Sequence, residues 1–130
     1  MQLKEAIQTL NAPKPSGPYS QGVKKDQFIF VSGQDGVQPG EDEENRGSIA
    51  EQTEACLDHI KSILSEKDAD LNAIVHMTCH LADLNGQTVQ EFNRVYEMYF
   101  RNVEVKPARI TVGSQLLGTD VEITAIAAVE

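Results

Sequence analysis

The spacing of hydrophobic positions along the chain predicts two helices. Residues 49–64 place apolar and small side chains at helical intervals, and Ser48 and Glu51 at their start have the spacing of a capping box. Thr88 and Glu91 share that spacing and predict a second capping box at the start of another helix. The apolar stripe of this second helix consists of Val89, Phe92, Tyr96 and either Tyr99 or Phe100.

Four further segments have the character of β-strands. Residues 27–33, 108–116 and 121–129 are rich in strand-forming side chains, and residues 73–82 alternate between apolar and polar positions. An extra strand near the N-terminus is left open. The alternating segment places Val75, Met77, Cys79 and Leu81 on one face and His76, Thr78 and His80 on the other. The order, roughly β-α-β-α-β-β, predicts one α+β two-layer domain over residues 1–130, with both helices on one face of a sheet.

The face of this sheet that the helices leave open is expected to be half polar. Its side chains are short or β-branched, which suits a fully solvated surface poorly, so we expect this face to meet another subunit. The residues assigned to it are His76, Thr78, His80, Arg109, Thr111, Glu122 and Thr124.

Charge and composition narrow the possible partners. The chain has 130 residues, a formal net charge of −9 and no Trp, and no basic stripe is evident. Nucleic acid and anionic membranes are therefore not expected as partners. The N-terminus has no secretory pattern, and the two cysteines, Cys56 and Cys79, occupy apolar positions as expected for buried free thiols. These features favour a cytoplasmic protein.

Most catalytic and metal-binding patterns are missing from the sequence. His76 and His80 lie four residues apart on a predicted strand, which separates them by about 13 Å, too far for one metal ion. The acidic run at 40–45 lacks calcium-loop spacing and is expected to be a solvated loop. Arg109 and Glu122 are the remaining pair: if their strands are neighbours, both charges reach one cavity, either as a structural ion pair or as a site.

Several motifs, taken in order, resemble the RidA/YjgF family of reactive imine and enamine deaminases, for which endoribonuclease L-PSP is another label. The resemblance covers essentially the whole chain and implies a chorismate-mutase-like α+β fold with a mixed sheet. It also implies a homotrimer whose sheets enclose a central barrel, with ligand clefts between subunits. The motifs are GPYSQG at 17–22, FVSGQ at 30–34, EFNRVYEMYF at 91–100, KPAR at 106–109 and VEITAIA at 121–127.

The resemblance also implies an activity: cofactor-free hydrolysis of enamines and imines such as 2-aminoacrylate to 2-keto acids and ammonia, without a metal. Arg109 would clamp the substrate carboxylate, and Glu122 would polarise water or shuttle a proton. Tyr19 of a neighbouring subunit would close the pocket. Ser32 and Asn93 match positions that shape it, and Thr111 stands where the family often has Cys or Thr.

The chain also departs from the family pattern. Ile110 replaces a common Ser or Thr, Thr124 replaces a second glutamate, and DGVQPG follows FVSGQ. Substrate preference is therefore open, and so is a second hypothesis: a module that binds small carboxylates without turnover. A third, an endoribonuclease, is disfavoured by the net charge of −9 and the missing histidine acid–base pair.

Overall fold

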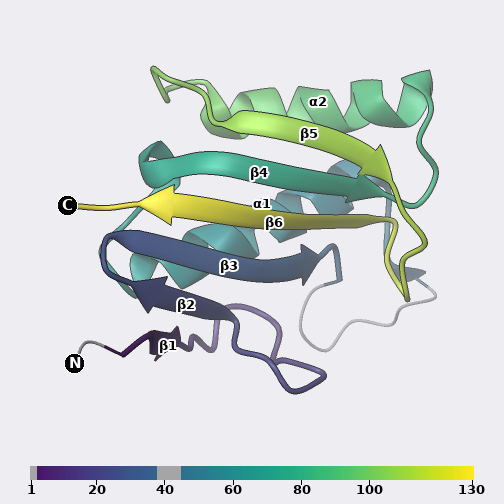
Figure 1. Ribbon diagram of the computed structural model, residues 1–130. Helices are drawn as coiled ribbons and strands as arrows, with labels where there is room; N and C mark the ends of the chain where they lie inside the picture. Colours follow the sequence, from purple (N-terminus) through teal and green to yellow (C-terminus); the bar gives the residue numbers. More distant parts are fainter. Residues whose placement is uncertain (1–2, 38–44) are drawn as a thin grey trace.

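The computed structural model describes residues 3–37 and 45–130, which form a six-stranded sheet with two helices packed on one face (Figure 1). This confirms the predicted two-layer α+β architecture, and an N-terminal strand is present. Most of the acidic run at 40–45 lies outside the described residues. The elements are β1 (Glu5–Ile7), β2 (Gly22–Lys25), β3 (Phe28–Asp35), α1 (Ile49–Ser65), a short 3₁₀ helix (Leu71–Ala73), β4 (Ile74–Leu81), α2 (Gly86–Phe100), β5 (Ala108–Gly113) and β6 (Val121–Ala128).

The strand order of the sheet is β1-β2-β3-β6-β4-β5. Only β4 and β5 run parallel, and the other neighbours are antiparallel. The reason is the connection through α2: a strand, a helix and a second strand form a crossover unit, which places β5 parallel to β4. Strand β6 then pairs with the free edge of β4. The last two strands are therefore not neighbours, because β4 lies between them, and the condition set for Arg109 and Glu122 to reach one cavity is not met.

The hairpin of β2 and β3 was not predicted from the sequence. Its turn reverses the chain at Asp26, which has a φ of 53°, a left-handed value that aspartate tolerates better than most residues. Lys24 supports the turn, because its ammonium group donates to the carbonyl of Asp26 at 2.6 Å. The turn contains no glycine, proline or asparagine, so the usual sequence signal for a hairpin is missing.

The two helix starts differ in how well they were predicted. The capping box of α1 at Ser48 and Glu51 is confirmed. At α2 the prediction is wrong, because the N-cap is Asn85 and Thr88 is the third helical residue of the box. Glu91 instead caps the neighbouring helix: its carboxylate accepts from a backbone N–H in the first turn of α1 at 2.8 Å.

The core lies between the sheet and the helices. Met77, Cys79 and Leu81 of β4 are fully buried there, as the alternation predicts. Val75 was assigned to the same face but is 48% exposed, and Ile74 is buried in its place. A register shift between residues 74 and 76 of β4 changes the alternation at this point.

No described helix is long and apolar enough to cross a membrane.

Burial keeps both thiols protonated. Burial raises the pKa of Cys56 well above its usual value, and it raises the pKa of Cys79 to about 12 against the opposing effect of the positive charge of Arg109. We therefore expect a thiol reagent such as Ellman's reagent to find no fast-reacting cysteine in the native protein at about pH 8, and both cysteines after denaturation. Rapid labelling of either thiol in the native state would contradict this packing.

Candidate functional site

Arg109 lies between the sheet and α2. On β5 its Cα pairs with that of Met77, a core residue of β4, so its side chain projects toward the helices. The guanidinium carbon lies 4.7 Å from the ring centroid of Tyr96 and 5.4 Å from that of Phe92. The rings of α2 thus offer their negative faces to the cation. No described residue forms an ion pair or hydrogen bond with Arg109, so its charge is available to an anion.

The assignment of Arg109 and Thr111 to the open face of the sheet is wrong. Thr111 pairs with buried Cys79, so both residues project toward the helix layer. The open face of β5 instead carries the alternate residues, and Ile110 there is 52% exposed. The assignment was wrong because it placed polar side chains on the open face. On this edge strand the polar side chains of Arg109 and Thr111 face α2, and the apolar side chain of Ile110 faces outward.

Two buried oxygens accompany Arg109 on the helix side. Thr111 Oγ1 and Asn93 Oδ1 are buried and have no hydrogen-bond partner among the described residues. Asn93 also lines a groove of about 520 Å³ on α2, together with Gly86, Val89, Gln90, Arg94 and Glu97. We call Phe92, Asn93, Tyr96, Arg109 and Thr111 the Arg109 cluster. It offers one cation and unused polar atoms beside a groove, which suits a small anionic ligand.

Glu122 lies on the other face of the sheet. On β6 it pairs with His80 of β4 and Asp35 of β3, and its neighbours along the strand, Val121 and Ile123, are buried in the core. Gly33 lies directly against its carboxylate: a Cβ added at Gly33 would be 2.9 Å from Glu122 Oε2. Gly33 also sits within the irregular stretch of β3, where a bulge shifts the register.

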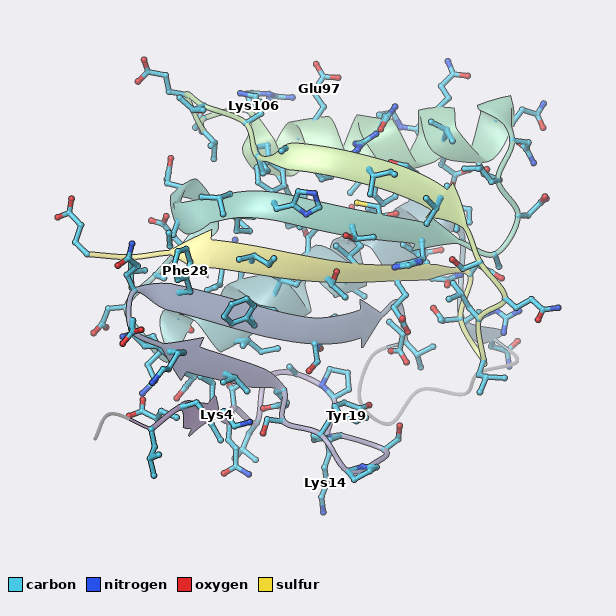
Figure 2. The ribbon with its side chains drawn as sticks, viewed as in Figure 1. Lys4, Lys14, Tyr19, Phe28, Glu97 and Lys106 are labelled. Carbon is cyan, nitrogen blue, oxygen red and sulfur yellow. The ribbon has the colours of Figure 1, made fainter. Side chains whose placement is uncertain are left out.

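Ser32 and Tyr19 extend this second group of residues. Ser32 Oγ donates to the carbonyl of Ser20 at 2.5 Å, which fixes the loop that carries Tyr19. Tyr19 is 49% exposed, and its hydroxyl is 3.3 Å from Ser16 Oγ. Figure 2 shows Tyr19 near the β1–β2 edge, at the opposite side of the sheet from Glu97 on α2. We call Tyr19, Ser32, Gly33 and Glu122 the Glu122 cluster.

The two clusters do not meet within one chain. Arg109 projects to the helix side of β5 and Glu122 to the open side of β6, and β4 separates the two strands. Neither the predicted shared cavity nor the alternative, an ion pair between the two, is present among the described residues. A larger hollow of about 750 Å³, which runs between residues 8–15 and Glu66, contains none of the predicted site residues.

Comparison with known proteins gives the family. The model of the family described as endoribonuclease L-PSP matches residues 9–129. The chain belongs to this family, also called RidA/YjgF. A RutC family protein of Pyrococcus abyssi is 47% identical over 95% of this chain and 96% of its own. The human 2-iminobutanoate/2-iminopropanoate deaminase is 33% identical, over 96% of this chain and 90% of its own.

Solved structures of related proteins share the fold. A crystal structure of a Thermotoga maritima protein has a TM-score of 0.88 and 36% identity, and covers 98% of this chain and 99% of its own. Escherichia coli TdcF with bound serine has a TM-score of 0.85 and 29% identity, over 97% of this chain and 99% of its own. The mixed sheet with two helices on one face is thus the family architecture, as the resemblance implied.

Sequence reasoning missed three contributors to these clusters. Phe92 and Tyr96 were assigned to the core stripe of α2, although they also hold the guanidinium of Arg109. Their spacing of four residues places both rings on one helix face. That spacing would have indicated a cation-binding pair only if an arginine had been known to lie beneath the helix. Gly33 was seen only as the end of a strand; the lone glycine inside FVSGQ was a signal for close approach of another group.

We predict that Arg109→Gln removes carboxylate binding and leaves the fold intact. The wild-type guanidinium has no ion pair or hydrogen bond with a described residue, and its loss removes only its contacts with the Phe92 and Tyr96 rings, so the thermal unfolding temperature should change modestly, while a small 2-keto acid such as pyruvate loses its bidentate partner. Binding followed by calorimetry or NMR should weaken at least about tenfold. Arg101→Gln, an exposed arginine at the end of α2, is the matched control. Equal pyruvate affinity in both variants would contradict this assignment.

Proposed function

We propose that the protein hydrolyses small imines and enamines that carry a carboxylate, giving 2-keto acids and ammonia without a cofactor, as a 2-iminobutanoate/2-iminopropanoate deaminase-like hydrolase. The observation that carries the proposal is the guanidinium of Arg109, which lies over two aromatic rings of α2 and has no ion pair or hydrogen bond with a described residue, together with the unpartnered buried oxygens of Thr111 on the same strand and Asn93 on the same helix. A partly buried cation without a protein counterion is costly in a structural role and useful in a binding role.

The proposed site is formed between copies of the chain, as ligand clefts of a homotrimer. In this arrangement the Arg109 cluster of one copy faces the Glu122 cluster of the next, which brings together residues that one chain holds apart. Support comes from the open face of the sheet, where Phe28, Phe30 and Ile110 are 39%, 45% and 52% exposed. Apolar exposure of this kind on a sheet is typical of a surface that another subunit covers.

The chemistry needs only positioning and one proton acceptor. Arg109 would hold the carboxylate of the substrate in a bidentate contact, which orients the adjacent C=N carbon. Glu122 would take a proton from water as the water oxygen bonds to that carbon of the protonated imine and the π electrons move to nitrogen. The proton then passes to the amine, the carbinol O–H proton returns to Glu122, and the C–N bond breaks to release ammonia and the keto acid.

Related proteins support the substrate class. Human and mouse proteins, 33% and 34% identical to this chain, are both 2-iminobutanoate/2-iminopropanoate deaminases. The structure of Escherichia coli TdcF contains serine, a small molecule with one carboxylate. Five relatives at 38–47% identity are named as RutC family proteins, and a yeast relative at 38% identity is Protein HMF1; these names point to no particular imine.

A second candidate function is capture of small carboxylates without turnover. It is favoured by the separation of the clusters, because the Arg109 cluster alone could hold a carboxylate with no contribution from Glu122. The two functions differ in what they require of Glu122, which the following substitution tests.

We predict that Glu122→Gln lowers kcat for hydrolysis of freshly generated imines by about a hundredfold or more, because it removes the proton acceptor. Pyruvate affinity should stay within about twofold of the wild-type value, since Arg109 remains. Ammonia and keto acid are measured above the spontaneous rate, with 2-aminoacrylate and imines derived from alanine, leucine and arginine. Unchanged hydrolysis in the variant would remove Glu122 from the mechanism; no wild-type acceleration on any substrate would favour the carboxylate-binding module.

We also predict that Gly33→Ala impairs hydrolysis without unfolding the protein. The new Cβ would displace the flexible carboxylate of Glu122, which lies 2.9 Å away, so kcat should fall about tenfold or more while the unfolding free energy changes by about 1 kcal/mol or less. Gly86→Ala at the start of α2 is the control, because a Cβ there has no neighbour within 4 Å. Full activity in Gly33→Ala would show that the position of the Glu122 carboxylate does not matter.

A further inference from the structure

His80 lies beside Glu122 on the open face of the sheet. The two residues are Cα partners in the antiparallel pairing of β4 with β6, and both are partly buried. Directly opposed residues of this kind have Cβ atoms about 5 Å apart and project to the same side. Both residues are described, and no direct hydrogen bond joins their side chains. Side chains that project together from opposed positions can be joined by a bridging water, here between the imidazole and the carboxylate.

Ser114 holds the imidazole of His80 at one nitrogen. Ser114 Oγ lies 2.8 Å from His80 Nδ1, a hydrogen bond that either tautomer of the ring can form. The serine is itself anchored, because its backbone N–H donates to the carbonyl of Leu81 at 3.0 Å. With Nδ1 engaged, Nε2 is the ring nitrogen that remains to exchange a proton.

The surroundings of His80 leave Glu122 as its main charged neighbour. On β5 its Cα partner is Val112, which is uncharged. On β3, Asp35 pairs with Glu122 and adds a second carboxylate two strands from His80. His76 shares the strand face but lies about 13 Å away along β4. Cys79, which precedes His80 in the sequence, and Arg109, which pairs with Met77 on the neighbouring strand, both project to the opposite face of the sheet.

We propose that His80 is a positioning residue that exchanges protons with Glu122 during imine hydrolysis, with Ser114 fixing its ring. This inference rests on the proposed function. In each turnover the carbinol O–H proton moves to Glu122 as the C–N bond breaks, so the carboxylate ends the cycle protonated. His80 Nε2 accepts that proton through a bridging water and passes it to solvent or to the released ammonia. The carboxylate is then restored, and the balance is one imine cation plus water giving keto acid plus ammonium.

Proton exchange by His80 predicts a specific pH dependence of kcat/KM. Histidine is the side chain that changes charge between about pH 5 and 8, and only the neutral ring can accept a proton. The ratio of wild-type kcat/KM to that of His80→Gln should therefore be about ten at about pH 8 and fall toward one as the pH is lowered into the acidic part of that range. The ratio cancels the titration of the substrate itself, because both enzymes meet the same imine.

Two further variants make this test specific. Ser114→Ala frees the ring and should give the same pH trend with a smaller loss than His80→Gln. His76→Gln removes a histidine from the same strand face and should follow the wild-type profile throughout. A wild-type to His80→Gln ratio that stays constant across the pH range would overturn the proposal, since a merely structural loss would lower activity equally at every pH.

An NMR measurement separates failure of this inference from failure of the proposed function. In Glu122→Gln the Cε1–H resonance of His80 should move, while that of His76 stays in place, because only His80 lies opposite residue 122. If the wild-type protein hydrolyses no imine but the His80 resonance moves, the deaminase function fails and the pairing of the two residues stands. If hydrolysis is present and the resonance does not respond, the proton exchange between His80 and Glu122 is wrong.

Discussion

Two features of the sheet decide where the proposed site residues lie. One is the alternation of side chains between the two faces of the sheet, and the other is the order of its strands. Because β4 separates β5 from β6, and because Arg109 and Glu122 project to opposite faces, the chain cannot close a site on itself. A one-residue shift of β5 would bring Arg109 to the open face and destroy its contact with α2. In the proposed site, the register of the parallel pair β4–β5 therefore matters as much as either charged residue.

The charge of Arg109 is retained at a place where an apolar residue would pack more simply. The faces of Phe92 and Tyr96 offset part of the loss of water around the guanidinium, and they do so without neutralising it, as a carboxylate would. Burial raises the pKa of Tyr96 to about 12, and its hydroxyl contacts Met77, so this ring stays neutral. In a chain of net charge −9, this cation is well placed to attract a small anion rather than a polyanion.

Local patterns predicted the helices and most strands because short-range chemistry determines them. The capping box at Ser48 and Glu51 is complete within four residues and was predicted correctly. At the start of α2, Asn85 and Thr88 are both suitable N-cap residues, and only the backbone geometry decides that Asn85 is the N-cap. The resemblance of several motifs to the RidA/YjgF family identified the family correctly. Which face Arg109 takes depends on pairing between distant segments, and no spacing along the sequence contains that information.

The central claim is that the site is completed by two copies, and subunit complementation tests it most directly. Arg109→Gln and Glu122→Gln chains are co-expressed with different tags, mixed oligomers are isolated, and imine hydrolysis is measured beside each parent. In the proposed trimer, each isolated mixed oligomer has one interface in three that joins an intact Arg109 to an intact Glu122, so activity should recover to about a third of the wild-type value. Activity no higher than that of either parent, in verified mixed oligomers, would place both residues in a single-chain site and contradict the account.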